Sequence, residues 1–167
     1  MISKTINRMM APFLAILCLQ SMAQSSAVQE KQDAYLKLKT LIELKQYRFH
    51  AYTATSMKGR TIQLTSEYFL KLNKDSLLVD LPYYGRAYSA DYAGTNMGVQ
   101  FTSTRFSYNS DTTKKGSWEI TIEPKNENKA SKIYLSVGSG GYCSLRITSN
   151  SREAISYYGK ITAYDVR

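Results

Sequence analysis

The stretch YRFHAYT, residues 47–53, decides the fold class because apolar and polar side chains alternate along it. In an extended chain Tyr47, Phe49 and Ala51 share one face, and the residues between them share the other. This two-residue period is typical of a β-strand that buries one face.

The residues before this stretch follow a different period. From about residue 29 to residue 45, Ala34, Leu38 and Leu41 are spaced by three and four, and charged residues lie between them. No glycine or proline interrupts the segment. We predict an amphipathic helix here, whose apolar stripe packs on the rest of the domain.

After residue 53 the alternation returns in short runs that are separated by polar turns. The strand-like runs are residues 61–65, 68–72, 76–81, 98–102, 105–108, 117–123, 132–137, 142–148 and 154–162. Consecutive strands joined by short turns pair antiparallel. The prediction is a mainly β (α+β) domain: an antiparallel, strongly curved sheet or barrel of about eight to ten strands with one N-terminal amphipathic helix.

The first 23 residues have the pattern of a secretory signal peptide. Lys4 and Arg8 precede the apolar run 9–19, which is too short to span a bilayer, and small residues follow at Ser21 and Ala23. We predict cleavage after Ala23. The mature chain, residues 24–167, is then a single β-rich domain without a transmembrane segment, exported to the periplasm or secreted.

The two cysteines bear on processing and on redox chemistry. Cys18 follows Leu17, where a lipoprotein signal would have a small residue, so signal cleavage is favoured over lipidation. Cys143 then stays alone and forms no intramolecular disulfide. It shares a predicted strand face with Leu145 and Ile147, which indicates a buried, unreactive thiol.

The charge of the chain narrows the choice of partner. Of 22 basic residues, Lys4 and Arg8 lie in the signal, so the mature chain keeps 20 against 13 acidic residues, a net charge of +7. Export and the scattered positions of the basic residues argue against nucleic acid. The expected partners are an anionic glycan, a lipid head group or an envelope protein.

No catalytic signature is present. His50 is the single histidine and is interpreted as a solvated strand residue, and no G-x-S-x-G motif accompanies it. One histidine and one mature cysteine do not make a zinc site, and no cofactor motif is found. A Ser-His-Asp triad that uses His50 stays open as an alternative, and a glycosidase would need paired carboxylates. The candidates are Glu67, Asp75, Asp80 and Asp91.

The segment LPYYGRAYSADYAG, residues 81–94, is the first candidate for a binding surface. If it is extended, Tyr84, Arg86 and Tyr88 project from one face, where rings and a guanidinium could stack on a sugar and pair with an anion. The alternative is cross-strand packing for stability alone. A related run, YYGK at 157–160, suggests a second group. The candidate contact residues are Tyr83, Tyr84, Arg86, Tyr88, Tyr92, Tyr157, Tyr158 and Lys160.

Several runs combine aromatic residues, glycine and charges in a recognisable way: EYFLKL at 67–72, LPYYGRAY at 81–88, GVQF at 98–101, KGSWEI at 115–120, GGYCSL at 140–145 and ISYYG at 155–159. Across residues 30–162 the chain resembles an uncharacterised domain-of-unknown-function family of small exported proteins from Bacteroides-like Gram-negative bacteria. It departs from that family at SNSR, residues 149–152, where the family tends to have asparagine directly before arginine. The resemblance implies export and one β-rich domain, and it brings no activity.

Three hypotheses about function follow. The first is an exported, non-catalytic binding module for an anionic or glycan-like ligand. The second is an envelope protein with an interaction or structural role and no small ligand. The third is a carboxylate-dependent hydrolase. A deep pocket lined by the tyrosines would favour the first, and an open edge strand the second.

Overall fold

The computed structural model describes residues 28–86, 88, 98–114, 116–125 and 129–164. The predicted signal peptide, Asp91 and Tyr92 lie outside these residues. The chain divides into two compact units, residues 1–36 and 37–167. Residues 28–43 are helical, and the second unit contains the end of this helix and the whole sheet. None of the described helices is long and apolar enough to cross a membrane.

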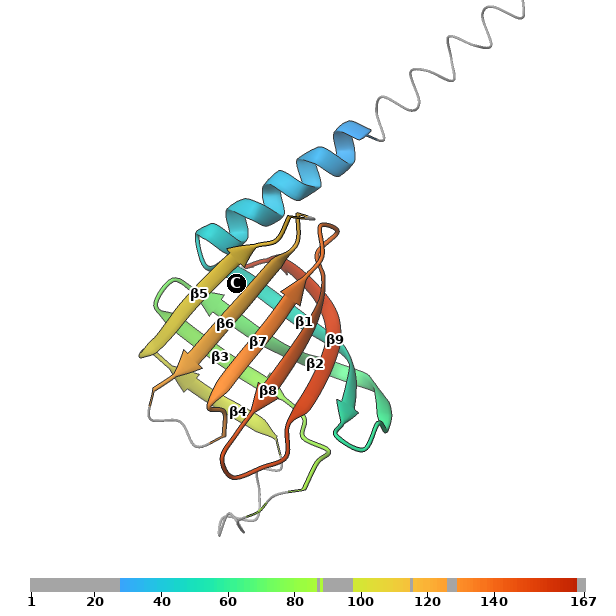
Figure 1. Cartoon of the computed structure of the whole chain (residues 1–167), viewed down its shortest axis with the longest axis vertical. Coiled ribbons are helices and arrows are strands. Elements are labelled where there is room, and N and C mark those ends of the chain that lie inside the picture. The colour runs from blue at the N-terminus through green and yellow to red at the C-terminus, as the bar shows by residue number, and fades with distance from the viewer. Residues whose placement is uncertain (1–27, 87, 89–97, 115, 126–128, 165–167) are drawn as a thin grey trace, which may run out of the picture. The chain divides into compact units, whose positions relative to one another are not determined.

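Nine antiparallel strands form one sheet that nearly closes into a barrel. They are β1 (Gln46–Ser56), β2 (Thr61–Asn73), β3 (Ser76–Leu81), β4 (Val99–Ser103), β5 (Phe106–Thr112), β6 (Trp118–Pro124), β7 (Lys132–Val137), β8 (Tyr142–Thr148) and β9 (Ile155–Ala163). Their order in the sheet is β4-β3-β2-β1-β9-β8-β7-β6-β5. In Figure 1, β5–β8 lie in front and cross over β1–β4 behind them. The mainly β class and the single helix predicted from the sequence are confirmed for the described residues.

The first and last strands meet at the centre of the sheet. β1 pairs with β9 from Tyr47 opposite Ala163 to Ser56 opposite Ile155, and the register shifts between Ala51 and Thr53. Such a bulge increases local twist and coiling, which a closing sheet needs. Because every other pair joins described strands that follow each other in sequence, β1–β9 is the one strand pair among them that joins the two halves of the sheet.

Alternate residues of the strands fill the interior. Tyr47, Phe49 and Ala51 are all buried, which confirms that they share the inward face of the first strand. Cys143 is buried with Leu145 and Ile147 as predicted, and burial raises the pKa of its thiol far above the usual range. The remaining interior side chains include Ala54, Leu70, Leu72, Leu77, Val79, Leu81, Val99, Trp118, Ile120, Ile122, Ile133, Leu135, Val137, Ile155, Tyr157 and Ile161.

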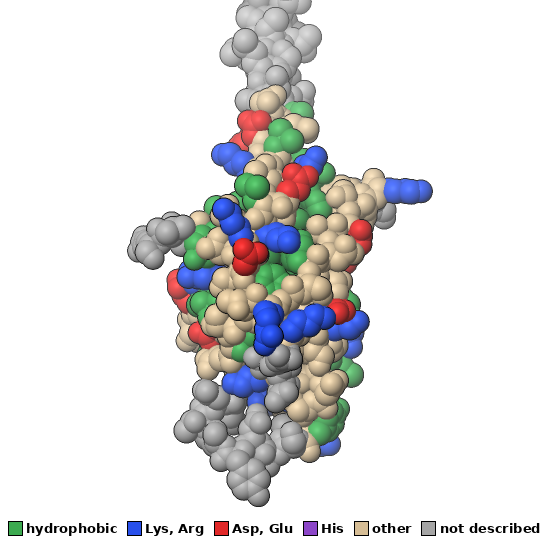
Figure 2. Space-filling model, turned by 90° about the vertical axis from the view of Figure 1, so that its left-hand side faces the viewer, with side chains coloured by type: hydrophobic (Ala, Val, Ile, Leu, Met, Phe, Trp, Pro, Cys, Tyr) green, Lys and Arg blue, Asp and Glu red, His purple; other side chains and the backbone are tan. Residues whose placement is uncertain are grey.

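The two edges of the sheet, β4 and β5, follow each other in sequence and yet do not pair. Ser103 at the end of β4 turns the chain: its Oγ lies 3.0 Å from the Arg105 carbonyl oxygen and 3.3 Å from the Arg105 backbone nitrogen. The Lys125 backbone N–H then donates to the Arg105 carbonyl, which ties the corner to the end of β6. The sheet is therefore open along one seam. Figure 2 views the side of the molecule that carries β5, where lysine and arginine are scattered among acidic side chains.

The end of the helix is fixed against the barrel. Leu38 and Ile42, one turn apart, are buried, whereas Leu44 is 54% exposed. Lys45 has a φ of 54°, a left-handed conformation that ends a helix. The Tyr108 hydroxyl of β5 donates to the Ile42 carbonyl at 3.2 Å, which satisfies one of the helix's terminal acceptors.

Two element boundaries differ from the sequence prediction. Residues 61–65 and 68–72 belong to the single strand β2, and β5 continues to Thr112, where a turn was predicted. Both extra segments are largely exposed. Residues 109–112 pair with β6, whereas residues 64–67 lie where the register between β1 and β2 shifts. Such a segment carries no apolar alternation from which a strand is recognised.

Candidate functional site

The segment after β3 folds back on itself and does not continue as a strand. The Tyr83 hydroxyl lies 2.7 Å from the Arg86 carbonyl oxygen and 3.0 Å from that of Glu153, so its one proton is shared between two backbone acceptors. Gly85 lies against the Tyr83 ring, where a Cβ would overlap it. Burial raises the pKa of the Tyr83 phenol, with a further rise from Glu153. Tyr83 therefore shapes this turn.

The same turn is fastened to the segment before β9. The backbone N–H of Glu153 donates to the Arg86 carbonyl at 3.0 Å, and that of Tyr88 donates to the Ser151 carbonyl at 2.8 Å. Arg152 is buried, with its guanidinium carbon 5.2 Å from the centre of the Tyr83 ring and its Nη1 3.2 Å from the Gly98 carbonyl oxygen. These contacts connect residues 151–153 to Tyr83, Arg86 and Tyr88 and so stabilise the turn after β3.

The candidate contact residues of the first group differ in exposure. Tyr84 and Arg86 are exposed, and Tyr88 is 70% exposed, while Tyr83 is half-buried. The prediction that Tyr84, Arg86 and Tyr88 project from one face assumed an extended chain, and the described residues of this segment do not form a strand.

The second predicted group is divided between the two faces of β9. Tyr157 is 1% exposed, and its hydroxyl donates to the Pro82 carbonyl at 2.7 Å. This places Tyr157 in the core, out of reach of a surface ligand. Tyr158 is 47% exposed on the outer face, and Lys160 also points to that face.

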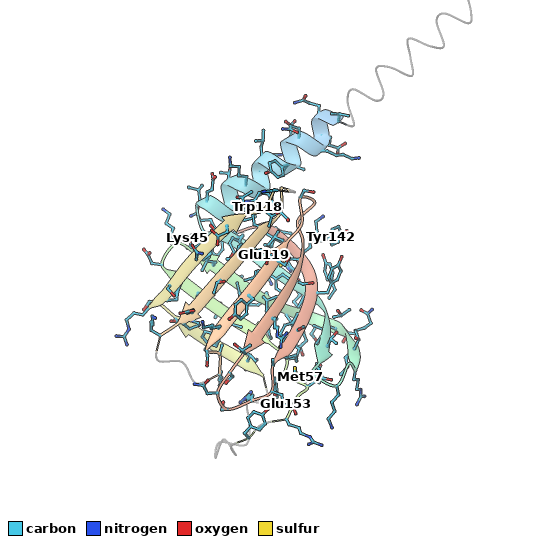
Figure 3. All side chains as sticks on the ribbon, viewed as in Figure 1. Lys45, Met57, Trp118, Glu119, Tyr142 and Glu153 are labelled. Carbon is cyan, nitrogen blue, oxygen red and sulfur yellow. The ribbon has the colours of Figure 1, made fainter. Side chains whose placement is uncertain are left out.

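Tyr158 takes part in an aromatic and cationic cluster that the sequence interpretation missed in part. Its ring is stacked on that of Tyr142 from β8, with centroids 6.1 Å apart and planes 6° from parallel. The Lys160 ammonium lies 5.2 Å from the centre of the Tyr142 ring. We call Tyr142, Tyr158 and Lys160 the tyrosine platform. Figure 3 shows Tyr142 in the upper half of the barrel, at its right-hand side, and Glu153 at the lower end, where its backbone contacts Tyr83 and Arg86. The platform is therefore separate from the first predicted group.

A groove of about 550 Å³ lies on the outer face of β2, β1 and β9, next to the platform. The strand registers place its residues: Lys71 is opposite Arg48, Arg48 is opposite Thr162, and His50 is opposite Lys160 of the platform. We call this the β1 groove. It is lined by Arg48, His50, Glu67, Lys71, Thr162, Ala163 and Tyr164.

The β1 groove carries two cations and one carboxylate. The Arg48 guanidinium carbon lies 4.3 Å from the centre of the Phe69 ring, and Nη2 is 3.3 Å from a Glu67 carboxylate oxygen. The Lys71 ammonium lies 5.0 Å from the same ring. The buried Arg48 Nε has no hydrogen-bond partner. The pKa of His50 is lowered, first by burial and then by Arg48, so the imidazole is neutral at pH 7 and the positive charge comes from Arg48 and Lys71.

Residues 29–161 match the family model described as a domain of unknown function, DUF4251. The chain belongs to the DUF4251 family. The crystal structure of a DUF4251 family protein from Bacteroides eggerthii is similar in fold: the TM-score is 0.57 at 19% sequence identity, and the match covers 78% of this chain and 87% of the other. No curated protein matches the chain. The comparisons therefore identify a family and a fold, and they assign no activity to either.

Three of the four carboxylates proposed for a hydrolase lie in the described residues, and they are dispersed over this DUF4251 fold. Of these three, Glu67 lines the β1 groove, and it pairs with Arg48. Asp80 accepts a hydrogen bond from the Gln100 side chain at 2.7 Å, and Asp75 lies in the turn between β2 and β3. No group of three or more His, Cys, Asp or Glu side chains in the described part of the chain is placed to hold a metal ion.

The sequence interpretation of His50 as a solvated strand residue missed the β1 groove. The signal was present in part, because Arg48 and His50 share the polar face of the first strand. What was needed in addition was the register that sets Lys71 and Thr162 beside them. A two-residue period identifies the outer face of a strand without identifying the neighbouring strand.

Proposed function

We propose that this DUF4251 member is an exported, non-catalytic binding module for an anionic, glycan-like ligand. The observation that carries the proposal is the tyrosine platform, an exposed pair of stacked rings with an ammonium over one of them. The signal pattern of residues 1–23 and the net positive charge support the exported location and the sign of the ligand.

The platform has the chemistry that a charged sugar requires. Tyrosine rings present an apolar face to the C–H groups of a sugar ring, and their hydroxyls stay available to its polar rim. The Lys160 ammonium over the Tyr142 ring is a strongly hydrated point charge, suited to a carboxylate or an ester anion. The two strands hold the rings in place through the directly opposed pairs Tyr142–Lys160 and Ser144–Tyr158. A ligand therefore meets a preorganised surface, which lowers the entropic cost of binding.

Calorimetric titration with three probes tests the proposal: a galacturonate oligosaccharide, a neutral maltooligosaccharide and vesicles of phosphatidylglycerol. We expect the acidic oligosaccharide to bind in preference to the neutral one. Replacing Tyr158 by leucine should weaken that binding about fivefold or more, since an aromatic contact contributes on the order of 1 kcal/mol.

Tyr134→Leu is the matched control, because Tyr134 is 40% exposed on β7 and is not part of the platform. It should leave the affinity unchanged. Equal losses in the two tyrosine variants, or equal affinities for the acidic and neutral oligosaccharides, would contradict the proposal. Binding to the vesicles alone would shift the ligand class from glycans to lipid head groups.

A further inference from the structure

We propose that the β1 groove is a binding site for a phosphate or sulfate monoester carried on a sugar-sized group. The inference goes beyond the proposed function because it assigns a second site, with its own ligand chemistry, to residues that do not belong to the tyrosine platform. The two sites adjoin through the opposed residues His50 and Lys160.

The donors of the groove suit a tetrahedral anion. Arg48 from β1 and Lys71 from β2 are directly opposite each other and supply the donors. Thr162 from β9 lies on the other side of Arg48, where its hydroxyl donates to the Arg48 carbonyl at 3.4 Å and its oxygen can still accept from a protonated ester. A planar carboxylate is satisfied by one bidentate arginine, whereas an ester phosphate or sulfate presents three oxygens that several donors can share.

Cation–π contacts with aromatic rings position the Arg48 and Lys71 side chains in the groove. The centre of the Phe69 ring lies 4.3 Å from the Arg48 guanidinium carbon and 5.0 Å from the Lys71 ammonium nitrogen. The centre of the Tyr164 ring lies 5.9 Å from the same ammonium nitrogen. Cation–π contacts leave the N–H groups of both side chains free to donate in other directions. The Arg48 Nε is buried without a hydrogen-bond partner, so the guanidinium meets a ligand through its outer nitrogens, of which Nη2 contacts Glu67.

Without a ligand, the Glu67 carboxylate occupies the place beside Arg48 that the ester anion would take. Its side chain is 83% exposed and contacts Arg48 through one oxygen at 3.3 Å, so the pair is weak and solvated. An arriving ester competes with Glu67 for Arg48, and the carboxylate can turn into solvent at little cost. The volume of about 550 Å³ exceeds that of a bare phosphate and leaves room for the group to which the ester is attached.

The test titrates the protein with glucose 6-phosphate, glucose 6-sulfate, glucuronate and glucose, by calorimetry or by the NMR shifts of His50. The two esters should bind with a Kd on the order of millimolar, and glucuronate and glucose more weakly. Lys71→Gln should weaken ester binding about tenfold, and Lys58→Gln, an equal charge change in the exposed turn between β1 and β2, should not.

Glu67→Gln gives the sharpest result, because removing the competing carboxylate should tighten ester binding several-fold, where a purely structural role would leave it unchanged. The inference is wrong if Lys71→Gln behaves like Lys58→Gln, if Glu67→Gln fails to tighten binding, or if glucuronate binds as well as the esters. Phosphatidylglycerol vesicles that bind when glucose 6-phosphate does not would also overturn it. Tyr158→Leu should leave ester binding unchanged. The proposal for the tyrosine platform and the proposal for the β1 groove can therefore be contradicted independently of each other.

Discussion

At the scale of single residues, the two neighbouring tyrosines of β9, Tyr157 and Tyr158, lie on opposite faces of the strand and have different roles. Tyr157 points inward and joins β9 to the chain beyond β3 through the Pro82 carbonyl, whereas Tyr158 points outward and stacks on Tyr142. Burial raises the pKa of Tyr157 so far that the phenol stays protonated as a donor throughout the accessible pH range. One dipeptide thus contributes both to the core and to the surface.

The pair provides a matched test of this division. Tyr157→Phe removes the donor to a buried carbonyl and should lower the free energy of unfolding by about 1 kcal/mol. Tyr158→Phe removes a solvent-exposed hydroxyl and should change it by less than about 0.5 kcal/mol. Urea denaturation followed through Trp118, which is buried, measures both. Equal effects in the two variants would show that the Pro82 contact does not stabilise the protein.

At the scale of elements, Gly159 determines how closely β9 approaches β1. A Cβ at this position would overlap the His50 carbonyl and come within 2.9 Å of a Phe49 ring carbon. The position lies directly opposite Ala51, where the register of the two strands shifts. The absence of a side chain therefore allows the bulged strand to pass close to its partner.

Gly159→Ala should destabilise the protein by about 2 kcal/mol or more, because the obstructing atoms are backbone and cannot rotate away. Gly138→Ala is the control: the nearest atom to its Cβ would be the Tyr142 carbonyl oxygen at 3.5 Å, an ordinary contact. That change should be neutral or slightly stabilising. Thermal unfolding of the two variants side by side gives the comparison, and a Gly159→Ala variant as stable as the parent would refute the close approach.

At the scale of the whole molecule, the β1–β9 pair lies at the centre of the sheet, and β4 and β5 are its two edge strands. β1 and β9 have partners on both sides. β5 pairs with β6 alone among the described strands, so its other edge offers unpaired backbone groups. An unpaired edge is also where another chain could add a strand, which is the observation that favours the envelope-interaction hypothesis.

Hydrogen exchange followed by mass spectrometry should rank the strands accordingly. Peptides from β1 and β9 should exchange only through global unfolding, and those from β5 should exchange fastest. β6, one strand further in, is the internal control. Protection of β5 that rises with protein concentration would indicate that a second copy covers the seam, and protection equal to that of β9 at all concentrations would contradict an open sheet.

The sequence predicts faces better than it predicts neighbours. The alternation at 47–53 and the shared face of Cys143, Leu145 and Ile147 follow from the period alone. The pairing of β1 with β9 does not, because nothing in a strand's period specifies a partner about 100 residues away.

The same limit applies to the sites. Tyr158 and Lys160 were identified from a repeated motif, but the motif equally included Tyr157, whose inward direction depends on the register of β9. The β1 groove needs three strands side by side, and its residues are dispersed between positions 48 and 164. A cluster that only tertiary pairing creates leaves no local pattern to recognise.

The central position of the C-terminal strand has a consequence for synthesis of the chain. β1 is synthesised first, and its partner β9 follows about 100 residues later. At about 5–20 residues per second, the synthesis of β9 follows that of β1 by roughly 5–20 s. During this delay the edge of β1 has no partner, and the barrel cannot close. A chain cut short before residue 155 lacks β9, so β1 and β8 each lose the strand that pairs with them at the middle of the sheet.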